Sequence, residues 1–61
     1  GQILRLIGNG VGTIPAMVEQ MYVGIDRRLF GAAEHSVLAH LVDLERRGVV
    51  EAEAGTWRNR G

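Results

Sequence analysis

The sequence predicts a small α+β domain in which three helices are followed by a two-stranded hairpin. Two observations carry this prediction. Residues 33–47 have the apolar spacing of an amphipathic helix, and Gly48 stands where a glycine commonly ends one. The next residues, 49–58, alternate around Gly55 in the way that the two strands of a short hairpin do. A helix that passes through a glycine turn into a two-stranded flap is how a winged-helix domain ends, so we expect that fold.

The length and composition exclude several classes of protein. A chain of 61 residues holds one domain, near the lower end of what folds alone. It begins with glycine rather than methionine, so we expect residues 1–61 to be a single domain from a longer protein. The sequence shows no signal peptide and no apolar run near the roughly 20 residues that span a bilayer. With no cysteine it predicts neither a disulfide nor a thiolate zinc site, which suits a cytoplasmic protein without membrane contact.

The charge balance gives no general attraction to nucleic acid. Seven acidic and seven basic side chains cancel, and every basic one is arginine. A domain with zero net charge lacks the broad attraction to phosphates that a basic domain has, so a nucleic-acid site would need a local basic patch. The use of arginine alone, with abundant glycine and alanine, favours a GC-rich bacterial source.

The first two helices are expected at residues 2–7 and 14–22. Between them, Gly8-Asn-Gly-Val-Gly12 resembles a phosphate-binding loop only in composition, because it follows a helix and lacks the lysine of such loops. We interpret its glycines as turn residues. Thr13 is a suitable N-cap, and Pro15 is tolerated in the first helical turn. The apolar stripe of the second helix is Ile14, Met17, Val18, Met21 and Tyr22.

A connection of about eight residues leads to the third helix, with a helical turn expected after Asp26. Gly31 is expected to mark the entry to that helix, at residues 32–47. The strands are expected at residues 49–54 and from Trp57, with Gly55 and Thr56 forming the turn. The expected core is Ile3, Leu4, Ile7, Ile14, Met17, Val18, Met21, Val37, Leu38, Leu41, Leu44 and Val50.

No catalytic or metal-binding constellation emerges from the sequence. His35 and His40 are five residues apart on one helix, about 140° around its axis, so they cannot share an ion. We expect His35 in solvent and His40 hydrogen-bonded at the core edge. Ser36 lies within reach of His40 but lacks an oxyanion hole and an orienting acid. Glu51 and Glu53 share one face of a strand, where a solvated edge is the simpler interpretation.

Nucleic-acid binding is the main alternative to a docking role. The available basic groups are Arg46 and Arg47 at the end of the third helix and Arg58 and Arg60 beyond the wing turn. The candidate contacts among them are Arg46, Arg47 and Arg58. Acidic residues on the same helix face and on the wing would repel phosphate. The connection before the third helix is also longer than the 3–4 residues typical of helix-turn-helix readers. We therefore favour an ordinary solvated face. The opposing acidic residues are Asp43, Glu51 and Glu53.

Several large apolar residues exceed what so small a core can hold. We expect some of them to form an apolar docking patch on the surface. The candidate docking residues are Tyr22, Ile25, Leu29, Phe30 and Trp57.

The run from Thr13 to Val49 resembles a known family. Its most specific part is Ser36-Val-Leu-Ala-His-Leu41, followed by Leu44-Glu45 and Gly48. The pattern is similar to the winged-helix domain at the C-terminus of metallo-β-lactamase-fold hydrolases of the β-lactamase-like-protein-2 type, relatives of glyoxalase II and RNase Z. The long connection is ordinary in that family. Gly31 is a departure, because relatives often have proline there.

The resemblance implies a zinc-dependent hydrolase as the parent protein. Its N-terminal catalytic domain would carry a His-x-His-x-Asp-His site for two zinc ions, which activate a water as nucleophile. No catalytic, metal or cofactor residue carries over to this chain. The small domain would pack on its own catalytic domain, or on a second subunit as a homodimer, and help wall the substrate groove. Some members of the family cleave RNA, so the domain could also guide RNA to the parent active site.

A rival hypothesis comes from the run Leu44-Glu-Arg-Arg-Gly-Val-Val50, which also resembles MarR-like regulators. That resemblance implies a DNA-binding transcription factor. The two hypotheses differ in salt dependence, because a DNA reader loses affinity steeply as salt rises and a docking domain binds no duplex at all.

Overall fold

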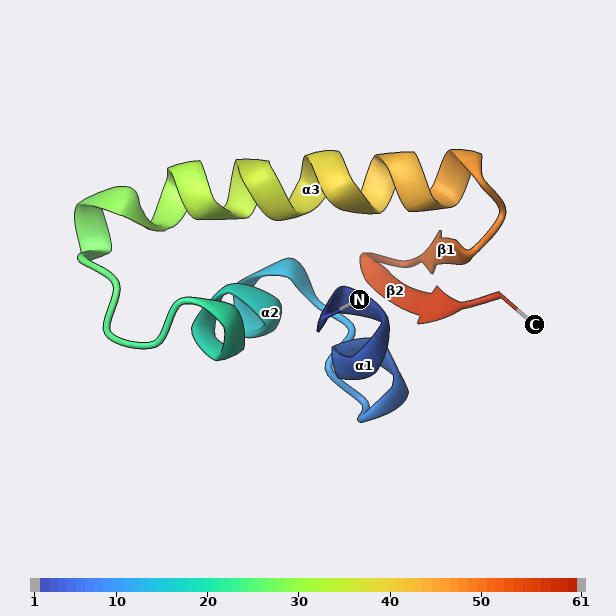
Figure 1. Cartoon of the computed structure of the whole chain (residues 1–61), viewed down its shortest axis with the longest axis horizontal. Coiled ribbons are helices and arrows are strands. Elements are labelled where there is room, and N and C mark those ends of the chain that lie inside the picture. Colours follow the sequence, from blue (N-terminus) through green and yellow to red (C-terminus); the bar gives the residue numbers. More distant parts are fainter. Residues whose placement is uncertain (1, 61) are drawn as a thin grey trace.

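The computed structural model describes residues 2–60, and it has the predicted architecture of three helices followed by a two-stranded antiparallel hairpin. In Figure 1 the long helix α3 lies above α1 and α2, and the hairpin lies below its C-terminal end. The elements are α1 (Gln2–Gly8), α2 (Ile14–Met21), the 3-10 turn η1 (Arg27–Leu29), α3 (Phe30–Arg46), β1 (Val50–Glu53) and β2 (Thr56–Asn59).

Glycines end both α1 and α3 in the same way, as the sequence predicts. Gly48 has a φ of 76°, a left-handed conformation that glycine adopts without a steric penalty. The next N–H, of Val49, then donates to the carbonyl of Leu44 at 3.0 Å. At the end of α1, Gly10 has a φ of 88° and donates to the carbonyl of Ile7 at 3.0 Å. Carbonyls that would otherwise lack a partner at each helix end are thereby satisfied.

The start of α3 differs from the prediction. The helix begins at Phe30, so Gly31 lies inside its first turn and does not mark an entry. The reason is that η1 runs directly into α3: Leu29 and Phe30 both have right-handed helical dihedral angles, and no break remains for a glycine to provide. The predicted turn after Asp26 is confirmed as η1. None of the helices within residues 2–60 combines the length and apolar character needed to cross a membrane.

The hairpin turn is one residue earlier than predicted. Ala54 and Gly55 form a two-residue turn with φ values of 54° and 81°, and Thr56 already belongs to β2. Two positive φ angles give the turn a twist that matches the twist of the strands. In the resulting register Glu51 lies opposite Arg58.

The buried core contains most of the predicted residues. One predicted core residue is exposed, and two buried residues were not predicted. Leu38 is wrong as a core residue, because it lies at the edge of the buried face of α3 and 39% of it is exposed. Ala33 and Trp57 are buried but were not predicted to be. Trp57 lies opposite Ala52 in the hairpin and joins the core. The buried residues are Ile3, Ile7, Met17, Val18, Ala33, Val37, Leu41, Val50 and Trp57.

Candidate protein and nucleic-acid contact surfaces

Arg58 is engaged by acidic residues of its own hairpin. The antiparallel register brings its side chain to the face that carries Glu51 and Glu53. Its Nη2 lies 3.1 Å from Oε2 of Glu51 and 2.9 Å from Oε2 of Glu53. The hydrogen bond to Glu51, followed by the negative charges of Glu51 and Glu53, raises the pKa of Arg58. One cation between two carboxylates leaves a net negative group, which repels phosphate.

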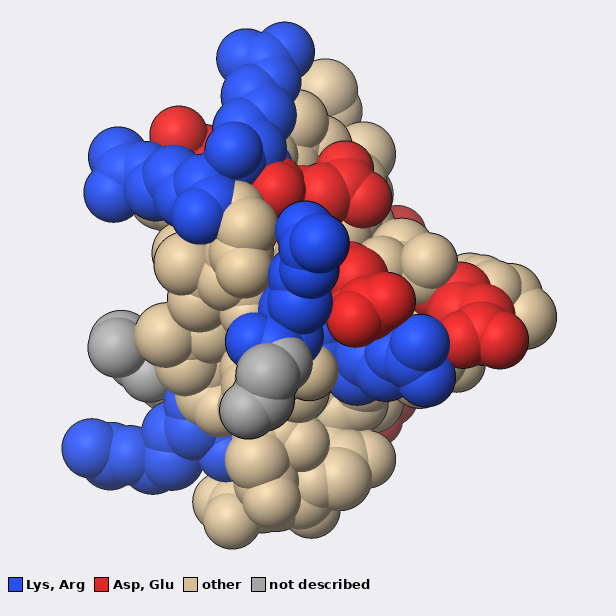
Figure 2. All heavy atoms as spheres, turned by 90° about the vertical axis from the view of Figure 1, so that its right-hand side faces the viewer, with Lys and Arg blue, Asp and Glu red and all other residues tan. Residues whose placement is uncertain are grey.

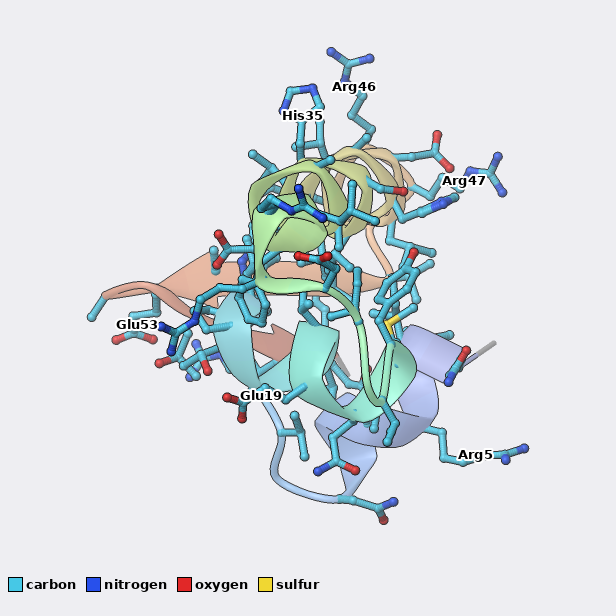
Figure 3. The ribbon with its side chains drawn as sticks, turned by 90° about the vertical axis from the view of Figure 1, so that its left-hand side faces the viewer. Arg5, Glu19, His35, Arg46, Arg47 and Glu53 are labelled. Carbon is cyan, nitrogen blue, oxygen red and sulfur yellow. The ribbon has the colours of Figure 1, made fainter. Side chains whose placement is uncertain are left out.

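The two arginines at the end of α3 do not join Arg58 in a basic patch. Arg47 is paired with Asp43 one turn earlier, with 3.1 Å between Nε and Oδ2. Arg46 has no ion-pair partner among residues 2–60, and Figure 3 shows it pointing away from the body of the domain while Arg47 points to one side. Figure 2 shows acidic side chains lying between the basic ones at this end of the molecule. The three candidate contacts therefore do not converge on one phosphate track.

The two histidines of α3 lie in different surroundings. His35 is exposed and points outward (Figure 3). His40 is also exposed, which corrects its expected place at the core edge. It lines a groove of about 280 Å³ between α1 and α3, with Met21 of α2 also contributing to the lining. Within the described chain, no three His, Asp or Glu side chains lie close enough together to hold a metal ion.

This groove, named here the α1–α3 groove, has an apolar floor and a polar rim. Its lining residues are Gln2, Ile3, Leu4, Met21, His40, Asp43 and Leu44.

The structure divides the five candidate docking residues into three groups. Tyr22 and Leu29 are on the surface, with 36% and 56% exposed. Ile25 and Phe30 are half-buried and pack against the core. Trp57 is wrong as a docking residue, because only 9% of it is exposed: β2 lies against α1 and turns the indole inward. The candidates that are exposed therefore lie on the connection between α2 and α3, and none of them lies on the wing.

Val23 is the apolar residue that the sequence prediction missed. It is 86% exposed, more than any other large apolar side chain described. The available signal was its position directly after the α2 stripe and before Gly24, whose φ of 79° turns the chain away from the core. Tyr22, Val23 and Leu29 together are named the connection surface.

The connection is held in a defined shape by Asp26. Its carboxylate accepts a hydrogen bond from the N–H of Arg28 at 2.9 Å and caps η1. The guanidinium of Arg28 also lies 2.9 Å from Asp26 Oδ2, and these hydrogen bonds, the side-chain bond first, lower the pKa of Asp26. A hollow of about 250 Å³ lies beside the turn. Its lining residues are Glu19, Tyr22, Val23, Gly24, Ile25, Arg27 and Phe30.

The helices and the paired strands define a small winged-helix domain. Residues 13–57 match the model of the Beta-lactamase associated winged helix domain, and the chain belongs to that family. This confirms the resemblance seen in the run from Thr13 to Val49. No curated protein and no solved structure matches the chain.

Proposed function

We propose that this chain is the C-terminal accessory domain of a zinc-dependent hydrolase of the metallo-β-lactamase superfamily. It packs on the catalytic domain of that protein and helps to shape the substrate groove, and it performs no catalysis itself. The zinc ions and the activated water belong to the catalytic domain. Family membership supports the proposal, because the family is described by its association with β-lactamases.

The single observation that favours a protein partner over nucleic acid is that two of the three candidate arginines are paired with carboxylates while large apolar side chains are exposed. Arg47 and Arg58 are both engaged by carboxylates of this chain. Val23 and Leu29, by contrast, expose most of their surface to solvent. DNA readers need a net positive surface, whereas protein interfaces bury apolar side chains. The surface therefore suits a protein partner better than a phosphate backbone.

The α1–α3 groove is our candidate for the contact with the catalytic domain. Leu4, Met21 and Leu44 are half-buried there and pack on the core from one side only, so a partner could cover their other side. His40 and Asp43 stand at the rim as exposed polar groups. An apolar centre with a polar rim is the usual anatomy of a protein interface.

The two histidines provide a matched test in the longer protein. Both are exposed on α3, but only His40 lines the groove. His40→Glu places a charge in the proposed interface. In the full-length protein it should lower the melting temperature of the catalytic domain toward that of the catalytic domain without the small domain, and calorimetry measures both. His35→Glu is the control and should leave that temperature unchanged.

Removal of the whole small domain tests the role more broadly. The catalytic domain alone should melt at a lower temperature and hydrolyse substrate more slowly. If its melting temperature and its kcat/KM are unaffected by the deletion, the accessory role is contradicted.

DNA binding by a MarR-like regulator is the alternative function. It would depend on Arg46, the one of the three candidate arginines without an ion-pair partner among residues 2–60.

A further inference from the structure

The hollow beside the connection surface carries one charge of each sign. Glu19 on α2 and Arg27 on η1 both line it, and both are exposed. Within the part of the chain that the structure describes, neither side chain takes part in an ion pair. Figure 3 looks onto this side of the molecule and shows Glu19 on α2.

The neighbouring residue Arg28, in contrast to Arg27, has an ion-pair partner in the same connection. Arg28 is bound to Asp26 by contacts of 2.9 Å and 3.3 Å from its side chain. Arg27 directly precedes it and remains unpaired within residues 2–60. Glu19 and Arg27 share one hollow but are not within ion-pair distance of each other. The two charges therefore line the same hollow without pairing with each other.

We propose that the connection surface binds a second copy of this chain. A twofold axis that passes through the hollow, between the two charges, would place Glu19 of each copy opposite Arg27 of the other. An interface of this kind needs a self-complementary surface, and two unpaired opposite charges that line one hollow supply it. Val23 lines the hollow and is 86% exposed, so it provides an apolar contact beside these pairs.

This inference goes beyond the proposed function and is compatible with it. The hollow beside the connection surface and the α1–α3 groove have no lining residue in common. One surface can therefore join two copies while the other contacts the catalytic domain. The small domain would then connect two subunits of the parent hydrolase.

The size of the domain indicates a weak dimer. Its accessible surface is 4283 Å². A specific interface at the lower size limit takes about 600 Å² from each copy, so it would use a seventh of this surface. The Asp26 cap already holds the connection in one shape, which reduces the entropy lost on binding. We therefore expect association in the micromolar-to-millimolar range.

Charge reversal and sedimentation velocity test the proposal with the 61-residue chain, after circular dichroism has shown that each variant is folded. The unaltered chain should self-associate as its concentration rises to millimolar. Glu19→Arg and Arg27→Glu, each alone, should weaken self-association about tenfold or more, because each places like charges opposite each other twice. The double variant E19R/R27E should associate like the unaltered chain.

Mixing the two single variants gives the sharpest result. The face with two arginines then meets the face with two glutamates, so a heterodimer should form. Arg27→Glu changes the formal net charge from 0 to −2, and Arg5→Glu does the same on α1. Arg5→Glu is therefore the control: alone it should self-associate normally, and mixed with Glu19→Arg it should give no heterodimer of comparable strength.

Two results would overturn the proposal. One is a chain that stays monomeric at millimolar concentration. The other is self-association that Glu19→Arg and Arg27→Glu weaken no more than Arg5→Glu does.

Discussion

The backbone N–H of Trp57 donates to the carbonyl of Gly12 at 2.7 Å, and this hydrogen bond ties the wing to the loop before α2. The indole of Trp57 is buried in the core at the same place. The wing is therefore part of the folded body through both its backbone and its side chain. This arrangement makes β2 a structural element of the domain.

Gly12→Ala should destabilise the domain by about 1–3 kcal/mol. A Cβ at this position would stand 2.8 Å from both the Thr56 methyl group and the Trp57 carbonyl oxygen, so the wing would have to move. Gly31→Ala is the control, since a Cβ there meets nothing within 4 Å and lies inside α3. It should stabilise the domain by about 0.5–1 kcal/mol. Urea unfolding measures both, and equal effects would contradict the close approach of Gly12 to β2.

Ala54→Asn should stabilise the hairpin by roughly 0.5–1 kcal/mol. Ala54 has a φ of 54°, which is unfavourable for alanine and much better tolerated by asparagine. Asparagine followed by Gly55 is also the preferred pair for a two-residue turn of this type. Thermal unfolding would show the gain, and a lower melting temperature would mean that the turn differs from the one described.

The Asp26 carboxyl should titrate below the value of about 3.9 that it has in an unfolded chain. Its pKa is lowered by the side-chain and backbone hydrogen bonds from Arg28. Because this pKa is lowered by folding, the ionised cap stabilises the connection at pH values above the pKa of Asp26 in the unfolded chain. That contribution is lost as the pH falls through the pKa of Asp26 in the folded chain. NMR titration of the Asp26 side chain measures the midpoint. Arg28→Ala should raise it, and an unchanged midpoint would rule out Arg28 as the cause.

The chain should not bind duplex DNA at low salt, and the triple alanine variant of Arg46, Arg47 and Arg58 should behave like the unaltered chain. Two of these arginines already have carboxylate partners, so few phosphates could be neutralised. Fluorescence anisotropy with labelled duplex measures this over a range of salt concentrations. Binding that weakens steeply with salt, and disappears in the triple variant, would instead support the DNA-reader hypothesis.

If the domain guides RNA to the active site of the proposed parent hydrolase, a different effect is expected in that full-length protein. There the same triple variant should raise KM for RNA more than it lowers kcat. An unchanged KM would contradict RNA guidance.

The sequence was sufficient for the order of the elements and most of the core. Apolar periodicity places α2 and α3 because each buries one face, and Gly10 and Gly48 mark helix ends that only a left-handed residue forms easily. The failures occurred where partners distant in the sequence decide the outcome. Trp57 is buried because β2 packs on α1, and Leu38 is exposed because no element covers its edge of α3.

The candidate site was less predictable than the fold. Its arginines could be named from the sequence, but their pairing with carboxylates could not. Arg58 reaches Glu51 and Glu53 only because the register of the hairpin places them on one face. Val23 was missed because a single apolar residue in a loop has no periodicity from which to infer its exposure.

The proposal that this domain serves a zinc-dependent hydrolase is tested most directly by the zinc content of the natural full-length protein. Inductively coupled plasma mass spectrometry should find about two zinc ions per full-length chain, as a two-metal hydrolase requires. The 61-residue chain is the control and should contain none. If neither protein contains metal, the hydrolase proposal is contradicted, and DNA binding becomes the better account of the domain.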